Sequence, residues 1–364
     1  MAERIEVPVS TPYTVVVGSD LDLAGQISSG LAPGAGPGNA VVVTDSNTGP
    51  LHAARLMEAL KASGWNVPGL VEVPAGEESK SLQTYSEVIR QLAGAGLTRD
   101  GTVFALGGGV VGDLAGFVAG TYMRGVGFVQ LPTTLLAMVD SSVGGKVGVD
   151  LPEGKNLVGA FVRPRMVLAD LGWLGTLPDR ELSCGLAEVV KMGLLAGGEF
   201  FDALGLVEDA RAGDTEALQT LVAHSVRFKA AVVAGDELEG GRRAILNYGH
   251  TIGHGLEAAA GYGLRHGEAI SAGMVAAARL SHQHYGKDLI GLHEDLLNAA
   301  GLPTKVAPMS MEKVLSAMGR DKKRRTADGV GNHSFVMLED VGKPEWGVRV
   351  SDEQAQSAIE AVLG

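Results

Sequence analysis

The first 176 residues alternate short apolar runs with longer segments of mixed polarity. Runs such as AVVVTD, TVFALGG and GFVQLPT are mostly apolar and lack the regular polar alternation of a half-exposed strand. Parallel strands that are covered by helices on both faces have this continuous apolar pattern. We therefore expect residues 1–176 to form an α/β domain built on a parallel sheet, with strands at IEVPV, YTVVVG, AVVVTD, VEVPA, TVFALGG, GFVQLPT and PRMVLAD.

The pattern changes near Leu177, where GWLGTLP supplies Gly and Pro before a fresh helical segment. Asp179 and Glu181 come early in that segment, where acidic residues favour the N-terminal end of a helix. A chain of 364 residues also exceeds what one hydrophobic core usually organises. We therefore expect a second, mostly α-helical domain over residues 177–364, with helices at LPDRELSCGLAEVVKMGLL, DTEALQTLVAHSVRFKAAVVAGDE, the segment after Asn247, GEAISAGMVAAARLSHQHYG, LIGLHEDLLNAAGL and DEQAQSAIEAVLG.

Composition narrows the class of protein. The formal net charge of −12 argues against a nucleic-acid or anionic-membrane partner, since both require clustered positive charge. Cys184 is the single cysteine, which excludes an intrachain disulfide and a thiolate-rich zinc site. The start of the chain lacks a secretory pattern, and charges and glycines interrupt the most apolar region, Gly107 to Val143. We expect a cytoplasmic protein.

Three glycine-containing segments each follow a predicted strand. TVFALGG runs directly into GGVVGDLAGFVAGTY, and PAGEESKSL and PTTLLAMVDSSVGGK follow two other strands. Glycine permits close backbone approach, and the free N–H groups at a helix start bind anionic oxygens. Loops after parallel strands meet at one sheet edge, so the pattern indicates a Rossmann-like nucleotide-binding domain. The spacing departs from GxGxxG, and tight packing alone stays an alternative for the glycine turn.

The segment Asn247 to Glu268, NYGHTIGHGLEAAAGYGLRHGE, contains His250, His254 and His266. Neutral imidazoles are common ligands of catalytic zinc. His250 and His254 are four residues apart and share a helix face, yet HTIGH lacks the glutamate of HExxH, which disfavours a protease. The spacing indicates a metal site but leaves open which histidines are ligands.

Long motifs between Glu72 and Asp321 resemble the 3-dehydroquinate synthase family. They are GEESKSL, LGGGVVGDLAGFVAGTYMRG, QLPTTLLAMVDSSVGGKVGVDLPEGKNLVGAF, TLPDRELSCGLAEVVKMG, DELEGGRRAILNYGHTIGH and RHGEAISAGM. The resemblance implies a homodimer that binds NAD and one divalent metal, zinc or cobalt. It also implies an N-terminal nucleotide-binding domain and a C-terminal helical domain.

The resemblance also implies roles for single residues. The metal ligands would be Glu188, His250 and His266. Residues expected to act in catalysis or to hold the substrate are His254, Lys146, Lys191, Lys229, Arg243, Asn247, Asn156, Asp140, Arg124, Lys322 and Lys323, of which Arg124 would reach the neighbouring subunit. Residues expected to contact NAD are Gly76, Glu77, Lys80, Gly108, Gly109, Val110, Val111, Gly112, Asp113, Thr133, Thr134, Lys146, Lys155 and Thr176.

The activity implied is the conversion of 3-deoxy-D-arabino-heptulosonate 7-phosphate to 3-dehydroquinate and phosphate, in the shikimate pathway of aromatic amino acid biosynthesis. NAD would oxidise the substrate transiently and be regenerated, with phosphate elimination and an intramolecular aldol closure as the other steps. Three alternatives remain: a sister sugar-phosphate cyclase, with an amino substrate among its variants, a metal-dependent polyol dehydrogenase, and a noncatalytic phosphosugar- or nucleotide-binding module.

Overall fold

The computed structural model describes residues 2–31, 36–261, 263–319 and 332–364, and it separates into two compact units. The first unit comprises Met1–Leu177 and Lys229–Leu238, and the second comprises Pro178–Phe228 and Glu239–Gly364. Helix α8 (Thr215–Gly235) therefore contributes residues to both units, changing from the second to the first at Lys229. The segment Lys229–Leu238 lies within the residues that the sequence pattern gives to a second domain.

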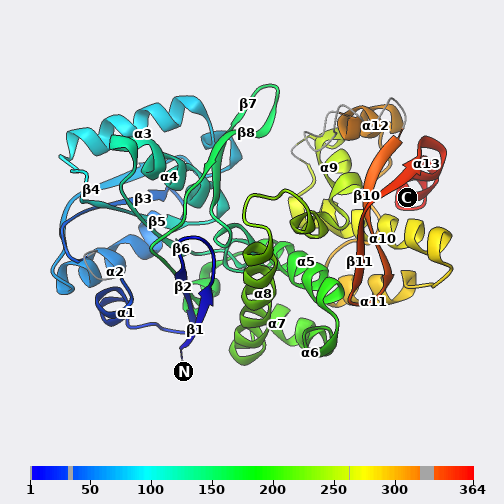
Figure 1. Ribbon diagram of the computed structural model, residues 1–364, viewed down its shortest axis with the longest axis horizontal. Coiled ribbons are helices and arrows are strands. Elements are labelled where there is room, and N and C mark those ends of the chain that lie inside the picture. The colour runs from blue at the N-terminus through cyan, green and yellow to red at the C-terminus, as the bar shows by residue number, and fades with distance from the viewer. Residues whose placement is uncertain (1, 32–35, 262, 320–331) are drawn as a thin grey trace. The chain divides into compact units, whose positions relative to one another are not determined.

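The first unit is built on a seven-stranded sheet (Figure 1). All of its neighbouring strands are parallel except β1 and β2. All seven predicted strands are present, which confirms the α/β prediction for this part of the chain. In spatial order they are β1 (Glu3–Val7), β2 (Tyr13–Gly18), β9 (Met166–Asp170), β6 (Gly127–Pro132), β5 (Thr102–Gly107), β3 (Asn39–Asp45) and β4 (Asn66–Val73).

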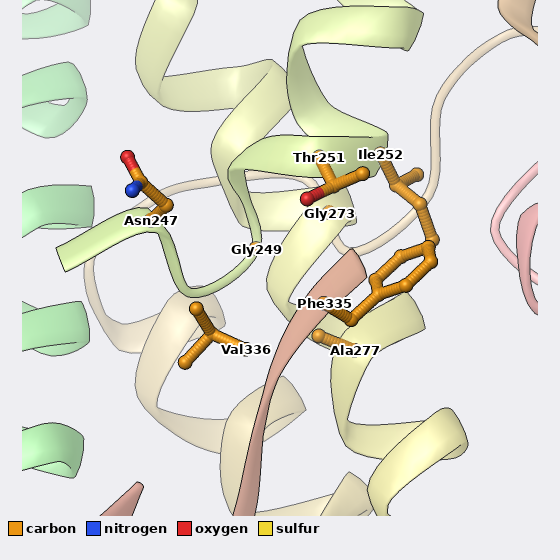
Figure 2. Close-up of a pocket in the computed structure, with 8 residues that line it drawn as sticks. All are labelled: Asn247, Gly249, Thr251, Ile252, Gly273, Ala277, Phe335 and Val336. Carbon is orange, nitrogen blue, oxygen red and sulfur yellow. The ribbon is translucent and has the colours of Figure 1, made fainter. Parts of the chain in front are cut away.

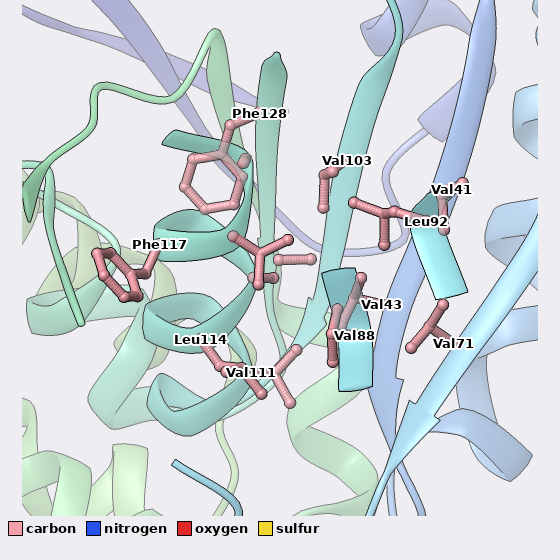
Figure 3. Packing of buried hydrophobic residues seen from close by; sticks show 14 of the residues in the cluster. Val41, Val43, Val71, Val88, Leu92, Val103, Val111, Leu114, Phe117 and Phe128 are labelled. Carbon is pink, nitrogen blue, oxygen red and sulfur yellow. The ribbon is translucent and has the colours of Figure 1, made fainter. Parts of the chain in front are cut away.

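Helices cover both faces of this sheet (Figure 1). Helices α3 (Leu82–Gly94) and α4 (Gly109–Thr121) pack over strands β3 to β6 and form the hydrophobic cluster in Figure 3. Leu92 of α3 and Leu114 of α4 are fully buried there. On the opposite face lie α1 (Leu23–Gly30) and α2 (Gly49–Ala62). The buried strands thus have helices on both sides, as their continuous apolar runs predict.

An antiparallel hairpin of β7 (Lys146–Leu151) and β8 (Gly154–Phe161) extends from the first unit (Figure 1). The sequence pattern did not predict it. Most β8 side chains are exposed or half-buried, so the strand lacks the apolar signal that marks the central sheet. Just before the hairpin, Ala137–Ser141 form a turn of π-helix, a rare geometry that occurs often at functional sites.

The second unit is mostly helical, as predicted. Its helices are α5 (Asp179–Ala196), α6 (Gly198–Ala203), α7 (Val207–Arg211), most of α8, α9 (His250–Ala259), α10 (His266–Tyr285), α11 (Ile290–Ala299), α12 (Met311–Gly319) and α13 (Asp352–Glu360). A hairpin of β10 (Asn332–Asp340) and β11 (Lys343–Ser351) was not anticipated. No helix in the described parts of the chain is both long and apolar enough to cross a membrane.

Two glycines bring α9 and α5 unusually close to α10. A Cβ atom on Gly273 of α10 would lie 2.2 Å from the carbonyl oxygen of Gly249, at the start of α9. A Cβ atom on Gly267 would lie 2.4 Å from the Cα atom of Cys184 in α5. Only glycine permits this contact. The first residues of α9 and α10, His250 and His266, are thereby held near α5.

Tyr248, just before α9 in the chain, forms a buried hydrogen bond with His293 of α11. His293 Nδ1 lies 2.7 Å from the carbonyl oxygen of Leu289, and this oxygen can only accept, so Nδ1 carries the proton. His293 Nε2 therefore accepts from the Tyr248 hydroxyl at 2.8 Å. Burial lowers the pKa of His293 to about 4, so the ring is neutral at pH 7.

The contact at Gly273 predicts a large effect of one added methyl group. Gly273→Ala should destabilise the fold by about 1–3 kcal/mol, because α9 or α10 must shift to admit the Cβ atom. Gly291→Ala in α11 is the matched control, since its Cβ atom would meet open space. It should be neutral or stabilising by up to about 1 kcal/mol. Urea unfolding compares them, and equal stabilities would refute the close packing.

The lowered pKa of His293 predicts a pH-dependent stability. Between its folded pKa of about 4 and its unfolded value of about 6.5, the unfolded chain binds the proton more readily. The free energy of unfolding therefore falls as pH decreases through this window, by about 2 kcal/mol between pH 7 and pH 5. His293→Gln should remove that part of the slope. Urea unfolding of both proteins at the two pH values tests this, and parallel pH dependences would contradict it.

Candidate functional site

Three helices of the second unit bring Glu188, His250 and His266 together. Glu188 lies in the middle of α5, and the two histidines are the first residues of α9 and α10. The Nε2 atoms of His250 and His266 lie 3.4 Å and 3.6 Å from Glu188 Oε1. A tetrahedral zinc ion with bonds near 2.1 Å separates its ligands by about 3.4 Å. Both histidine nitrogens therefore lie at about the zinc-ligand spacing from the Glu188 oxygen, and one donor atom from each of the three residues lies within 4.8 Å of the other two.

Each imidazole is oriented by a second hydrogen bond. His250 Nδ1 lies 3.0 Å from the carbonyl oxygen of Tyr248, and His266 Nδ1 lies 3.2 Å from Glu257 Oε2. Both partners accept hydrogen bonds, so each Nδ1 donates and each Nε2 is left to face Glu188. A carboxylate or carbonyl behind a histidine is the usual arrangement around a metal ligand.

Glu188 is a buried carboxylate, and among the residues that the structure describes no side chain or backbone group makes a hydrogen bond of normal geometry to either of its oxygens. Its side chain is 1% exposed and forms an ion pair with Lys191, which lies three residues later on the same helix face. A buried carboxylate usually has compensating hydrogen bonds or a bound cation, because its desolvation is costly. The orphaned oxygens therefore fit a divalent cation, and Glu188 with two imidazoles is a donor set that zinc and cobalt accept.

The pKa values of His250 and His266 shift in opposite directions. Burial and the nearby Lys191 ammonium hold the pKa of His250 well below its usual range, so this ring is neutral. Burial also acts to lower the pKa of His266, but the carboxylates of Glu188 and Glu257 outweigh it and raise the pKa to about 9. Metal binding would displace that proton, because a metal ligand must offer a free lone pair.

His254 lies beside the cluster and is exposed. The centroid of its ring lies 5.1 Å from that of His250 and 5.9 Å from that of His266. The structure thus brings together all three histidines that the sequence singled out. It adds Glu257, which we had not predicted. The signal was present, since residues 250, 254 and 257 recur at helical spacing on one face of α9.

Arg243 and Asn247 come from the short helix η6 (Arg242–Asn247), directly before α9. Arg243 is buried, and the Asn247 amide donates to the carbonyl oxygen of Ala244 at 3.0 Å. Asn247 and Thr251, which flank His250 in the chain, also border a small pocket (Figure 2). Its remaining walls are Gly249, Ile252, Gly273, Ala277, Phe335 and Val336.

In the first unit, the predicted glycine turn joins β5 to α4. Strand β5 ends at Gly107, and α4 begins at Gly109 with no side chain capping its first turn. The N–H groups at the start of α4 therefore point out of the carboxyl end of the sheet, where they can bind an anion. The neighbouring Thr134 accepts a hydrogen bond from the N–H of Ala137, so one of its roles is to cap the following helix.

Three predicted residues from distant segments meet near this edge. Lys80 is 5% exposed, and its ammonium contacts the Asp113 carboxylate at 2.6 Å and the side-chain oxygen of Asn156. Asn156 adopts a left-handed conformation with φ of +56°. Beside them, Lys155 Nζ lies 3.7 Å from Glu77 Oε1. The tip of the β7–β8 hairpin is thus fastened to the loop that precedes α3.

A second pair joins Lys229 of α8 to Asp140 in the π-helical turn. The Lys229 ammonium donates to the carboxylate of Asp140 at 2.7 Å and also to its backbone carbonyl. Lys229 is 5% exposed. The ion pair brings together two residues of the first unit that the family resemblance assigns to the substrate.

The remaining predicted residues lie in different settings. Lys146 is exposed at the start of β7. Thr176 donates to the carbonyl oxygen of Trp173 at 2.9 Å, and its hydroxyl lies 2.9 Å from His52 Nε2. Arg124 has a left-handed backbone with φ of +68°. Lys322 and Lys323 lie outside the described residues.

One polar loop at the same sheet edge was not among the residues predicted from the sequence. It follows β3, where Asp45 accepts hydrogen bonds from the N–H groups of Asn47 and Thr48 at 2.9 Å each. The hydroxyl of Ser46 accepts from the N–H of Ala75, in the loop after the neighbouring β4. The polar sequence TDSNT directly after an apolar strand is the pattern that could have indicated this loop from the sequence.

Comparisons with known proteins agree with the motifs. The family model "3-dehydroquinate synthase N-terminal" matches residues 70–184, and "3-dehydroquinate synthase C-terminal" matches residues 185–324. A 3-dehydroquinate synthase from Acidithiobacillus ferrooxidans is 50% identical over 319 residues, which cover 85% of each chain.

Two solved structures are similar over nearly the whole chain. One is 2-deoxy-scyllo-inosose synthase complexed with carbaglucose-6-phosphate, NAD+ and Co2+, with a TM-score of 0.86, 27% identity and full coverage of both chains. The other is ValA, a 2-epi-5-epi-valiolone synthase from Streptomyces hygroscopicus subsp. jinggangensis 5008 with NAD+ and Zn2+ bound, with a TM-score of 0.85, 25% identity and 97% coverage of each chain. Both family models match the chain, and one relative is 50% identical to it. The chain therefore belongs to the 3-dehydroquinate synthase family.

Proposed function

We propose that this chain converts 3-deoxy-D-arabino-heptulosonate 7-phosphate to 3-dehydroquinate and inorganic phosphate. It would be classed as a carbon–oxygen lyase, because phosphate leaves by elimination and the reaction has no net redox change. The observation that carries the proposal is the cluster of Glu188, His250 and His266 in a chain that is 50% identical to a 3-dehydroquinate synthase. The polyol dehydrogenase alternative would share the metal cluster but release NADH.

NAD and one divalent metal ion, zinc or cobalt, are the proposed cofactors. When bound, NAD would accept and return one hydride, and the metal ion would polarise the substrate hydroxyl that is oxidised. Two similar solved structures, which contain NAD+ with Co2+ or Zn2+, support this choice. Glu188, His250 and His266 would hold the ion, and the orphaned oxygens of Glu188 are the feature of this chain that supports it.

Residues beside the proposed metal ligands would handle charge and protons. Lys191 balances the buried Glu188 carboxylate and keeps its own ammonium near the cluster, where it can meet an anionic oxygen of the substrate. His254 is exposed beside both ligand histidines, so it can exchange a proton with a bound substrate. Arg243 and Asn247, on the segment that leads into His250, would bind substrate oxygens.

The first unit would bind the nucleotide at the carboxyl edge of its sheet, so we propose that residues 1–176 act as the NAD-binding domain and 177–364 as the metal- and substrate-binding domain. Gly108, Gly109, Val110, Val111 and Gly112, at the uncapped start of α4, would bind the pyrophosphate through backbone N–H groups. The other proposed contacts are Gly76, Glu77, Lys80, Asp113, Thr133, Thr134, Lys146, Lys155 and Thr176.

The substrate carries two anionic groups, a carboxylate and a phosphate. Binding it requires local positive charge in a chain whose net charge is −12. Lys229, held by Asp140, and Lys146, exposed at the start of β7, would supply it with Asn156, Lys322 and Lys323. We also propose a cytoplasmic homodimer in which Arg124 serves the neighbouring subunit. The adjacent Met123 and Arg124 both have positive φ, and such strained backbone is common at functional sites. The native mass tests the dimer.

The proposed ligand roles predict how metal content and activity separate. Glu188→Gln and His250→Ala should each lose tightly bound metal. Substituting a residue that only orients a ligand lowers metal affinity by about 10- to 100-fold, and loss of a ligand itself should lower it further. His254→Ala should keep the metal and lose turnover. His284→Ala, which replaces an exposed histidine of α10, is the control and should retain both. Metal analysis after gel filtration gives the metal content, and phosphate release gives the activity. Metal-replete, active Glu188→Gln protein would refute the site.

The reaction cycle predicts that NAD is used catalytically. Purified protein given the heptulosonate phosphate and a trace of NAD should release many phosphate ions per NAD molecule, because each hydride is returned. Absorbance at the NADH band should not rise in step with product. A stoichiometric NADH signal would instead identify a polyol dehydrogenase, and turnover of an amino sugar phosphate or sedoheptulose 7-phosphate in its place would identify a sister cyclase.

A further inference from the structure

His266 faces a carboxylate on each side of its ring. Its Nε2 lies 3.6 Å from Glu188 Oε1, and its Nδ1 lies 3.2 Å from Glu257 Oε2. Glu188 comes from α5 and is buried, whereas Glu257 comes from α9 and has a side chain 16% exposed. The same imidazole therefore belongs to two groups of donor atoms. The inner group is Glu188, His250 and His266.

The second group consists of His254, Glu257 and His266. One donor atom from each lies within 4.8 Å of the other two, and the same is true of the inner group. His254 and Glu257 are three residues apart in α9 and share a helix face. Two imidazoles and a carboxylate are the ligand types that zinc and cobalt take in proteins. The outer group therefore has the chemistry of a metal site of its own.

Exposure separates the two groups. The side chains that belong to the inner group alone, Glu188 and His250, are 1% and 12% exposed. Of those that belong to the outer group alone, Glu257 is 16% exposed and His254 is an exposed residue. A divalent cation arrives hydrated, and exposed donors can replace some of its waters while the others stay bound. The buried carboxylate of Glu188 can be reached only after more of that water is lost. The outer donors are thus the ones that a hydrated ion meets first.

The two groups cannot both use His266 as a neutral ligand. A neutral imidazole has one N–H and one free lone pair. With the lone pair on Nε2 facing Glu188, the Nδ1 proton is donated to Glu257. With the lone pair on Nδ1, the outer group is complete and the proton moves to Nε2, beside the Glu188 carboxylate. Occupation of one group therefore excludes occupation of the other.

We propose that His254, Glu257 and His266 form an outer divalent-cation site that binds zinc or cobalt before the ion passes to Glu188 and His250. His266 is the residue common to both positions, so the ion stays beside the same ring as it exchanges Nδ1 for Nε2, while the ring proton moves from Nε2 to Nδ1. Glu257 then has two roles, as a ligand of the arriving ion and as the hydrogen-bond acceptor that orients His266 once the ion is in the inner position.

Binding of CoCl₂ alone to metal-free protein tests the outer site without reference to any activity. Glu188→Gln removes the inner carboxylate with little change of shape, and this variant should still bind one Co²⁺, more weakly than the wild type. Adding Glu257→Gln or His254→Ala to Glu188→Gln should weaken that remaining binding by at least about 10-fold. Adding Glu353→Gln, at an exposed position of α13, is the matched control and should not.

Calorimetry gives the stoichiometry, the cobalt absorption bands report the ligands, and thermal unfolding confirms that each variant is folded. Two outcomes would overturn the proposal. One is equal Co²⁺ binding by Glu188→Gln with and without Glu257→Gln and His254→Ala. The other is wild-type protein that binds two Co²⁺ ions at the cluster together, since shared use of His266 permits one.

The rate of metal uptake separates a loading site from a purely orienting role of Glu257. Stopped-flow mixing of metal-free protein with Co²⁺ measures association and dissociation separately. Loss of an orienting hydrogen bond alone would raise the dissociation rate of Glu257→Gln and leave association unchanged. The outer site predicts slower association for both Glu257→Gln and His254→Ala, by about 10-fold or more. Unchanged association in both variants would exclude the loading role.

Discussion

The buried carboxylate of Glu188 is the constraint on which the proposed site depends. Removing a charged carboxylate from water costs several kcal/mol, and within the described parts of the chain neither oxygen receives a hydrogen bond of normal geometry. Lys191 supplies one compensating charge along the same helix. The remaining compensation must come from the direction of the two imidazoles, whose Nε2 atoms face the carboxylate. A divalent cation between the three donors satisfies all of them at once.

The rest of the second unit supports this geometry. Gly267 and Gly273 let α10 approach α5 and α9 closely, which sets the positions of the two helix starts that carry the histidines. The carbonyl of Tyr248 and the carboxylate of Glu257 then fix the orientation of each ring. Ligands from three helices can therefore be positioned without a loop that has to close, so the cluster is preorganised by ordinary helix packing.

Much of the fold could be predicted because its signals are local. The five mostly buried strands, β2, β3, β5, β6 and β9, appear as continuous apolar runs, and the long helices appear as periodic segments. The two hairpins, β7–β8 and β10–β11, were not predicted, since β8 is largely exposed and both hairpins depend on pairing across a turn. Spacing alone identified the histidine cluster but could not identify Glu188, which lies on another helix. Motif resemblance supplied it. Glu257 was missed because its role depends on a partner brought close by helix packing.

X-ray absorption spectroscopy of the zinc-loaded protein tests the central claim most directly, because it measures the atoms bound to the ion. The account predicts two imidazole nitrogens at about 2.0 Å and a carboxylate oxygen at about 2.0–2.2 Å, with water completing the coordination. In protein that carries both Glu188→Gln and Glu257→Gln, the carboxylate oxygen should be lost from this pattern. A wild-type spectrum dominated by six oxygen ligands, or one left unchanged by the two substitutions together, would contradict the account.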